Sequence, residues 1–239
     1  MTADQPLHEH LRRHAREKPD APAIVWYGRA ITWRELDGWS DALGAHLQSL
    51  GVQKGEPVAL FMNNCPQYVV AHYAIQKIGA IVCPCGPLNK AHELQYQLDD
   101  LKARTIIAAD NLLPIVQQVR GQTALEHVLA VRYGDLLPPE PTIDLPAELQ
   151  AAPAPLTADA TDMLSIAQRG AQAGQAPAPQ NITMDDIALM TYTSGTTGLP
   201  KGAMLSFGNA LFKTTVTAQS AGIGPDHVAL SVAPLYHIA

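Results

Sequence analysis

The sequence predicts an α/β fold of layered, mostly parallel sheets with helices on both faces. Short apolar runs that suit buried strands alternate along the chain with segments of helical periodicity. One of these runs, 58–62, is almost continuously apolar, as a strand covered on both faces is. The chain has 239 residues, of which 47% are hydrophobic, and this length and composition suit a globular α/β unit.

The first elements are expected to be a helix, a hairpin and a second helix. An amphipathic helix is predicted over 7–16, and a β-hairpin over 23–32. Thr32 and Glu35 have the spacing of a capping box, which predicts the start of the second helix. Gly51 is a natural stop for that helix.

The next elements follow the strand–helix rhythm that predicts the parallel sheet. Pro66 suits the first turn of one helix, and Asn89 is placed to cap another. The expected helices are 66–79, a segment after Asn89 and 112–119, and the expected strands are 58–62, 81–82, 105–108 and 128–131.

Composition divides the chain into three parts. Residues 1–136 are predicted to form a first α/β subdomain. Residues 137–181 are rich in Pro and Ala and are expected to be a connecting segment without a packed core, with at most one helix near 162–169. Residues 182–239 are expected to hold a strand at 188–191, a helix near 209–220 and a strand at 228–232, as the start of a second subdomain.

Charge and composition exclude several classes of function. The net charge of −6 gives no electrostatic reason to expect nucleic acid or an anionic membrane as a partner. No apolar stretch reaches the length that spans a bilayer, and the polar N-terminus does not suit a signal peptide. The expected location is therefore the cytoplasm.

The cysteines and histidines give no metal motif. The three cysteines do not suggest a disulfide framework, and Cys83 and Cys85 are expected to be small buried residues at a strand end. The first helix also carries histidines and arginines, and it is predicted to be a solvated surface helix: His8, His10, His14, Arg12, Arg13 and Arg16.

The most informative segment is 192–202, which reads Tyr-Thr-Ser-Gly-Thr-Thr-Gly-Leu-Pro-Lys-Gly. Glycines allow backbone N–H groups to approach an anion, hydroxyls add neutral donors, and a lysine adds a positive charge. We therefore predict a polyphosphate-binding loop in a strand–loop–helix layout, with a helix that begins near Ser206. The candidate binding residues are Thr193, Ser194, Gly195, Thr196, Thr197, Gly198, Pro200, Lys201 and Gly202.

This segment is not a Walker A loop, because Pro200 precedes Lys201 and Gly202 follows it. It resembles instead the phosphate-loop signature of the adenylate-forming superfamily, which includes acyl-CoA synthetases, coumarate–CoA-type ligases and peptide-synthetase adenylation domains. The resemblance covers most of the chain outside 137–180. Further similar stretches are Thr32-Trp-x-Glu-Leu36, Gly55–Leu60, Asn63-Asn-x-Pro66, Lys77-x-Gly-Ala80, Pro84–Leu88, Leu94-x-x-x-Leu-x-Asp100 and Pro234-Leu-Tyr-His237.

The resemblance implies an ATP-dependent acid–thiol ligase. A carboxylate would attack the α-phosphate of ATP, and coenzyme A would then displace AMP to give a thioester. The resemblance further implies that the loop holds the terminal phosphates with Mg²⁺, and that Thr193 supplies a hydroxyl on the metal side. It implies that Lys201 neutralises phosphate charge and that His237 lies in the acyl pocket as the candidate catalytic residue. The expected partners are ATP, coenzyme A and a carboxylic acid, with a medium- or long-chain fatty acid as the first choice.

Members of the superfamily are more than twice as long, and the motifs that follow Pro234–His237 in them are not found in this sequence. The chain is therefore interpreted as the N-terminal part of a large acyl-CoA synthetase-like domain, and the remainder of a parent chain is expected to complete the site. It is expected to be inactive by itself. Two alternatives remain: a non-catalytic, truncated phosphate-binding or interaction protein, and the adenylation module of a peptide synthetase.

Overall fold

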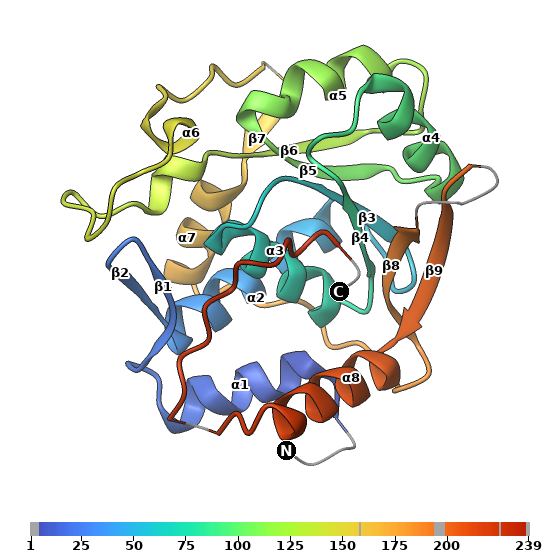
Figure 1. Cartoon of the computed structure of the whole chain (residues 1–239). Coiled ribbons are helices and arrows are strands. Elements are labelled where there is room, and N and C mark those ends of the chain that lie inside the picture. Colours follow the sequence, from blue (N-terminus) through green and yellow to red (C-terminus); the bar gives the residue numbers. More distant parts are fainter. Residues whose placement is uncertain (1–4, 158, 194–198, 225, 238–239) are drawn as a thin grey trace.

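A seven-stranded sheet forms the centre of the structure, a computed structural model that describes residues 5–157, 159–193, 199–224 and 226–237 (Figure 1). Its strands are β3 (Pro57–Phe61), β4 (Ile81–Cys85), β5 (Thr105–Ala109), β6 (His127–Val131), β7 (Ala160–Asp162), β8 (Ile187–Thr193) and β9 (Lys201–Ser206). They lie in the order β7-β6-β5-β3-β4-β8-β9, and every pair is parallel except β8 and β9. The predicted α/β fold with a mostly parallel sheet is confirmed.

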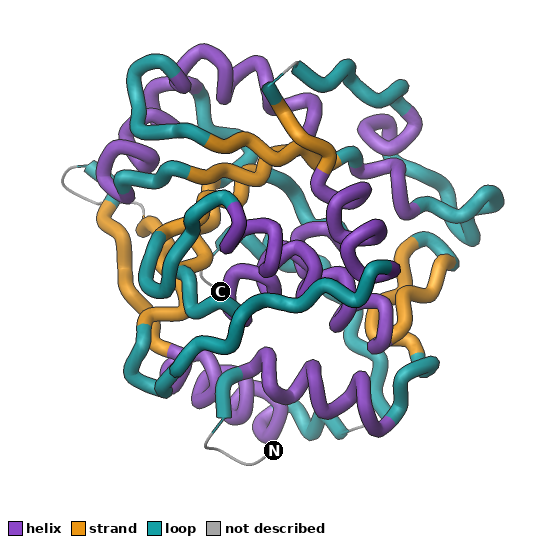
Figure 2. The backbone as a smooth tube through the Cα atoms, turned by 180° about the vertical axis from the view of Figure 1, so that it is seen from behind, coloured by secondary structure: helices purple, strands orange, loops and turns teal. Residues whose placement is uncertain are grey.

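Helices cover both faces of this sheet, as Figures 1 and 2 show from opposite sides. The helices are α1 (Leu7–Glu17), α2 (Trp33–Ser49), α3 (Pro66–Lys77), α4 (Ala91–Leu101), α5 (Leu113–Arg120), α6 (Ala147–Gln150), α7 (Met163–Gln172) and α8 (Phe207–Ser220). From β3 the chain crosses through α3 to β4 on one side, and from β4 it crosses back through α4 to β5 on the other side. Because such crossovers are right-handed, α3 and α4 lie on opposite faces. α2 packs with both α3 and α7, while α5 packs with α4.

A separate hairpin of β1 (Pro22–Trp26) and β2 (Arg29–Thr32) precedes α2, as the sequence predicts. The capping box at the start of α2 is confirmed, since Glu35 N–H donates to Thr32 Oγ1 over 3.2 Å and Thr32 N–H donates to Glu35 Oε2 over 2.8 Å. Gly51 follows the end of α2 with a φ of +88°, a conformation that glycine adopts without strain.

The predicted cap of α4 is wrong by one residue. Lys90 occupies the N-cap position, and its N–H donates to the Glu93 carboxylate over 2.7 Å. Asn89 belongs to the preceding turn, in which its N–H donates to the Gly86 carbonyl, and its side-chain amide binds Gln97. Because Asn89 is part of the turn that follows β4, α4 begins one residue later than predicted.

The segment 137–181 is more ordered than its composition indicates. It contains two helices, α6 and α7, where at most one is expected. β7 pairs with β6, and α7 packs against α2 with Met163, Leu164 and Ala167 buried. The helix predicted near 162–169 is confirmed as α7, and it joins the main core, because a few apolar residues at helical spacing are enough to dock one helix on an existing core. The three-part division of the chain stays a prediction.

Two expectations near the C-terminal end are wrong. The phosphate-loop segment is followed by β9 and only then by α8, so the layout is strand–loop–strand–helix. Residues 228–232 form no strand; Val228 and Leu230 are 92% and 87% exposed there, and an apolar run without a neighbouring strand has no ladder to join. The helix start itself is confirmed, because Ser206 and Asn209 form a capping box at α8.

The cysteine prediction is confirmed and the surface-helix prediction fails for two histidines. Cys83 and Cys85 are fully buried, and burial raises the pKa of the Cys85 thiol to about 12. His8 and His10 are only 4% and 6% exposed, so α1 is not solvated at these two positions. No helix in the described ranges is long and apolar enough to cross a membrane.

Candidate functional site

Three neighbouring strands end at one edge of the sheet. β3, β4 and β8 are parallel neighbours, so their carboxyl ends meet at the same edge. Asn63 and Asn64 follow β3, Gly86 follows β4, and Thr193 ends β8. Open parallel sheets bind their ligands outside this edge. The predicted loop and the Asn-Asn-x-Pro motif are therefore brought to the same side of the molecule.

The described part of the predicted phosphate loop consists of its two arms. Thr193 is the last residue of β8 and is paired with Lys201, the first residue of β9. The Thr193 hydroxyl lies 3.5 Å from the Lys201 carbonyl oxygen, to which it donates, and both residues are exposed. The hairpin thus pairs a residue with a hydroxyl and a lysine across its two arms at the sheet edge. The five predicted residues between the arms lie outside the described residues: Ser194, Gly195, Thr196, Thr197 and Gly198.

Gly202 has a packing role in β9. A Cβ at this position would lie 3.0 Å from the Met190 sulfur and 3.4 Å from the Tyr192 ring, and both of these residues are on β8. The missing side chain therefore lets two large side chains cross the neighbouring strand. This contact gives Gly202 a reason to be glycine that is independent of a phosphate ligand.

Helix α4 contacts both arms of the loop. The Tyr192 hydroxyl donates to Asp100 over 2.5 Å, and the Tyr96 hydroxyl donates to the Pro200 carbonyl over 2.8 Å. The rings of Tyr96 and Tyr192 meet edge to face with centroids 6.4 Å apart. Burial and the neighbouring Asp100 carboxylate raise the pKa of Tyr192, so its hydroxyl keeps the proton that it donates.

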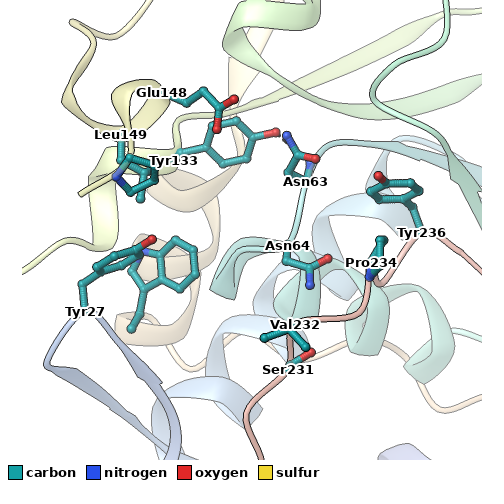
Figure 3. Close-up of a pocket in the computed structure, with 12 residues that line it drawn as sticks. Tyr27, Asn63, Asn64, Tyr133, Glu148, Leu149, Ser231, Val232, Pro234 and Tyr236 are labelled. Carbon is teal, nitrogen blue, oxygen red and sulfur yellow. Dashed lines mark hydrogen bonds between the residues drawn. The ribbon is translucent and has the colours of Figure 1, made fainter. Parts of the chain in front are cut away.

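A second segment reaches the same sheet edge from the C-terminal end of the chain. The Asn64 side chain bridges it through two hydrogen bonds, donating to the Ala233 carbonyl over 2.8 Å and accepting from Leu235 N–H over 2.7 Å. The Tyr68 hydroxyl donates to the Leu235 carbonyl over 2.9 Å. These contacts fix Pro234-Leu-Tyr-His237 beside the end of β3, where Figure 3 shows Asn64 next to Pro234. His237 itself is exposed, and its backbone N–H donates to the Pro234 carbonyl over 3.1 Å.

A cavity of about 340 Å³ adjoins this segment (Figure 3). It lies between the β1–β2 hairpin, the loop after β3, α6 and residues 231–236. Its lining includes Trp26, Tyr27, Asn63, Tyr133, Glu148 and Tyr236. The Tyr133 hydroxyl accepts from Asn63 N–H over 2.8 Å and so ties η2 (Tyr133–Leu136) to the end of β3. None of the residues predicted to bind phosphate is among the lining residues.

A metal site built from protein ligands alone is absent from the described part of the chain. Over these residues no group of three or more His, Cys, Asp or Glu side chains is placed to hold a metal ion. The Thr193 hydroxyl is a neutral oxygen of the kind that Mg²⁺ accepts next to phosphate oxygens. Thr193 therefore fits the role of one ligand to a metal ion that is held mainly by its nucleotide.

Comparison with known proteins identifies the family. The family model described as AMP-binding enzyme matches residues 11–239. The chain belongs to this family. Over 244 residues it is 34% identical to a long-chain-fatty-acid–CoA ligase of Salmonella typhimurium, and the match covers 98% of this chain and 43% of that protein.

Solved structures of this family share the fold. A long-chain-fatty-acid–CoA ligase from Archaeoglobus fulgidus superposes with a TM-score of 0.73 at 23% identity, over 97% of this chain and 43% of that one. An anthranilate–CoA ligase in complex with anthranoyl-AMP superposes with a TM-score of 0.72 at 24% identity, over 94% of this chain and 38% of that one. The chain thus spans about two fifths of the length of the proteins that it matches.

Several contact residues at the site were not singled out by the sequence. Asn64 and Asp100 were noted only as parts of family-like motifs, and Tyr68, Tyr96 and Tyr192 were not assigned a role at the site. A local signal exists for Asn64, since an Asn directly after a buried strand and before a helix-starting Pro often binds backbone. The tyrosine contacts span more than ninety residues of sequence and have no local signal.

Proposed function

We propose that the chain supplies the phosphate-binding and carboxylate-side part of the active site of an ATP-dependent acyl-CoA ligase. The observation that supports the proposal is the β8–β9 hairpin, in which Thr193 and Lys201 are paired beyond the carboxyl end of β4, in a chain of the AMP-binding family. The hairpin arms would bind the β- and γ-phosphates of ATP. Mg²⁺ would neutralise phosphate charge, with the Thr193 hydroxyl as a ligand.

In the first half-reaction a substrate carboxylate oxygen attacks the α-phosphorus of ATP. The bond from the α-phosphorus to its bridging oxygen breaks, and pyrophosphate leaves with the electron pair. Positioning and charge neutralisation carry most of the catalysis in such a step. Lys201 would stabilise the charge that develops on the leaving pyrophosphate, because its exposed ammonium group stands at the start of β9.

In the second half-reaction the sulfur of coenzyme A attacks the acyl carbonyl carbon, and AMP leaves with the carboxylate oxygen that bound it. We assign His237 to the wall of the acyl site, beside the carboxylate and the path of the thiol. Asn64 and Tyr68 support this assignment, since they hold Ala233 and Leu235 at the end of β3. A medium- or long-chain fatty acid is the proposed substrate, supported by the name of the Salmonella relative.

The test is acid-dependent ATP–pyrophosphate exchange by the full translation product that contains these residues. The assay should compare octanoate, palmitate, an aryl acid and a mixture of amino acids. Lys201→Gln, which keeps length and removes charge, is expected to lower exchange about 100-fold, in the range of losing one preorganised transition-state contact. Lys102→Gln is the matched control, since Lys102 is equally exposed but follows α4.

Exchange that depends on amino acids would point to a peptide-synthetase module instead. ATP hydrolysis that needs no acid, or exchange that is equal in Lys201→Gln and in the wild type, would contradict the proposal. The isolated 239-residue chain is expected to give no exchange, because Lys201 and His237 are both exposed to water in it. Robust exchange by the isolated chain would overturn that expectation.

A further inference from the structure

Both arms of the candidate phosphate-binding hairpin are tied to one helix that carries none of the residues assigned to phosphate. Tyr192, beside the last residue of β8, donates to Asp100 near the end of α4. Pro200, directly before β9, accepts from Tyr96 one turn earlier on the same helix. In Figure 1 α4 lies close to the hairpin end of β9 on the upper right of the molecule.

The two hydrogen bonds to the hairpin come from neighbouring positions on α4. Tyr96 and Asp100 are four residues apart, so they lie on one face of the helix and one above the other. The edge-to-face contact between the Tyr96 and Tyr192 rings fills the space between the two hydrogen bonds. Each arm is thus bound to α4 by one tyrosine hydroxyl. The Tyr96 hydroxyl belongs to α4 and binds the arm at Pro200, whereas the Tyr192 hydroxyl belongs to the other arm and binds Asp100 of α4.

The hairpin alone gives its arms little support. β8 is hydrogen-bonded to β4 at a single register position, Leu189 with Val82, while β9 is at the outer edge of the sheet. From Met190 to Thr193 the strand is paired with β9 only. Thr191 is buried, and Met190 and Tyr192 pack against the core, so the base of this stretch is held by packing. The hydrogen bonds from α4 are the side-chain contacts recorded closest to the loop ends of the two arms, at Tyr192 and Pro200.

Gly202 completes the arrangement. Its missing side chain leaves room for the Tyr192 ring to lie across β9 on the way to Asp100. A side chain at 202 would push this ring outwards and lengthen its hydrogen bond. The glycine, the two tyrosines and the aspartate therefore form one packing unit, which we call the α4 clamp: Tyr96, Asp100, Tyr192 and Gly202.

We propose that the α4 clamp is a positioning device for ATP, and that it holds the paired ends of the two arms, Thr193 and Lys201, in place on the body of the molecule. This inference rests on the proposed function. The clamp residues do not touch the nucleotide in this proposal; they act through the ends of the two arms. Loss of the clamp should leave the fold intact and weaken productive binding of the polyphosphate.

The first experiment measures the clamp itself, without relying on activity. Hydrogen–deuterium exchange of peptides from 188–193 and 201–206 should be compared between the wild-type chain and Tyr96→Phe, Asp100→Ala and Asp100→Asn. Tyr96→Phe and Asp100→Ala are expected to speed exchange in both arms and leave peptides from β3 and β5 unchanged. Asp100→Asn retains an acceptor oxygen for Tyr192 and is expected to stay close to the wild type. Asp99→Ala is the matched control, because Asp99 is an exposed neighbour on the same helix and belongs to no clamp contact.

The second experiment measures steady-state kinetics of the full translation product. Tyr96→Phe and Asp100→Ala are expected to raise the KM for ATP about five- to tenfold, the range that loss of one hydrogen bond produces, with the KM for the acid unchanged. The clamp proposal is overturned if exchange in the arms is unchanged in both variants, or if the KM for the acid rises as much as that for ATP. A wild-type protein without any acid-dependent exchange would refute the proposed function instead, and the hydrogen-exchange result would still decide whether the clamp exists.

Discussion

The inner strands of the sheet and the hairpin at its edge are held in different ways. The β3, β4 and β5 strands are almost wholly buried, with Val58, Leu60 and Phe61 at 0% exposure. In the hairpin and in α8, the helix that follows it, large apolar side chains face solvent, including Met204 at 63% and Phe212 at 71% exposure. Burial stabilises the inner strands, whereas a few hydrogen bonds from Asn64, Tyr68, Tyr96 and Tyr192 fix the parts that carry the candidate site.

This difference separates stability from function. Substitutions in the inner strands should lower the free energy of unfolding, because they leave cavities in a close-packed interior. Substitutions among the hydrogen-bonding residues at the edge should change the geometry of the site at a much smaller cost in stability. Three predictions test the contrast.

The largest effect is expected for Phe61→Ala in β3. Removing a fully buried aromatic ring should lower the free energy of unfolding by about 3–5 kcal/mol, from the lost burial and the remaining cavity. Phe212→Ala on α8 is the matched control in the other region and should change it by less than about 0.5 kcal/mol. Urea denaturation followed by circular dichroism measures both. If both variants lost the same free energy of unfolding, burial would not distinguish the inner strands from the region around the hairpin.

A smaller and more local effect is expected for Asn64→Ala. The variant loses both hydrogen bonds to Ala233 and Leu235 and should lower the free energy of unfolding by about 1–3 kcal/mol. Proteolysis within 231–237 should become faster. Asn63→Ala is the control, because the hydrogen bond recorded for Asn63 uses its backbone N–H, which the substitution keeps. If Asn63→Ala exposes this segment as much as Asn64→Ala does, the side-chain bridge is not what holds His237 in place.

The sequence predicts the inner region better than the edge. Continuous apolar runs indicated β3 and β5, and the Thr32–Glu35 pair indicated the start of α2, because these signals are local. β9 was not predicted, because it begins with Lys201 and Gly202. These residues were interpreted as the end of the phosphate loop, and Pro-Lys-Gly is not typical of the start of a strand. α7 was placed approximately but its packing was not predicted, since docking depends on the groove that α2 provides.

The sequence proposes the chemistry of the candidate site but does not indicate the contacts that hold it. The loop motif gives a candidate set of binding residues, which stays a prediction, and family membership rests on the match over residues 11–239. The contacts of Asn64 with Leu235, and of Tyr96 with Pro200, join positions 171 and 104 residues apart. Only the fold brings such pairs together, so no pattern of neighbouring residues could indicate them.

The smallest effect is expected for His8 of α1, which lies at the contact between α1 and α8. Its ring packs edge to face on Phe207 of α8 with centroids 5.7 Å apart, while α1 packs on α2. Burial, together with the positive charges of Arg12 and Lys77, lowers the pKa of His8 to about 3. An unfolded histidine has a pKa near 6.5. Between about pH 6.5 and pH 3 the unfolded chain therefore binds a proton at His8 that the folded chain does not bind.

The contribution of His8 to stability is therefore complete above about pH 6.5 and declines as the pH falls towards 3, by up to about 1.4 kcal/mol per pH unit. His8→Gln is neutral throughout this range, so its free energy of unfolding should fall less between pH 7.5 and 5.5 than that of the wild type. The difference between the two slopes is the quantity to measure, because carboxylates and other histidines contribute equally to both proteins. Parallel slopes would show that His8 is protonated in the folded state, and that the joint between α1 and α8 is open to water.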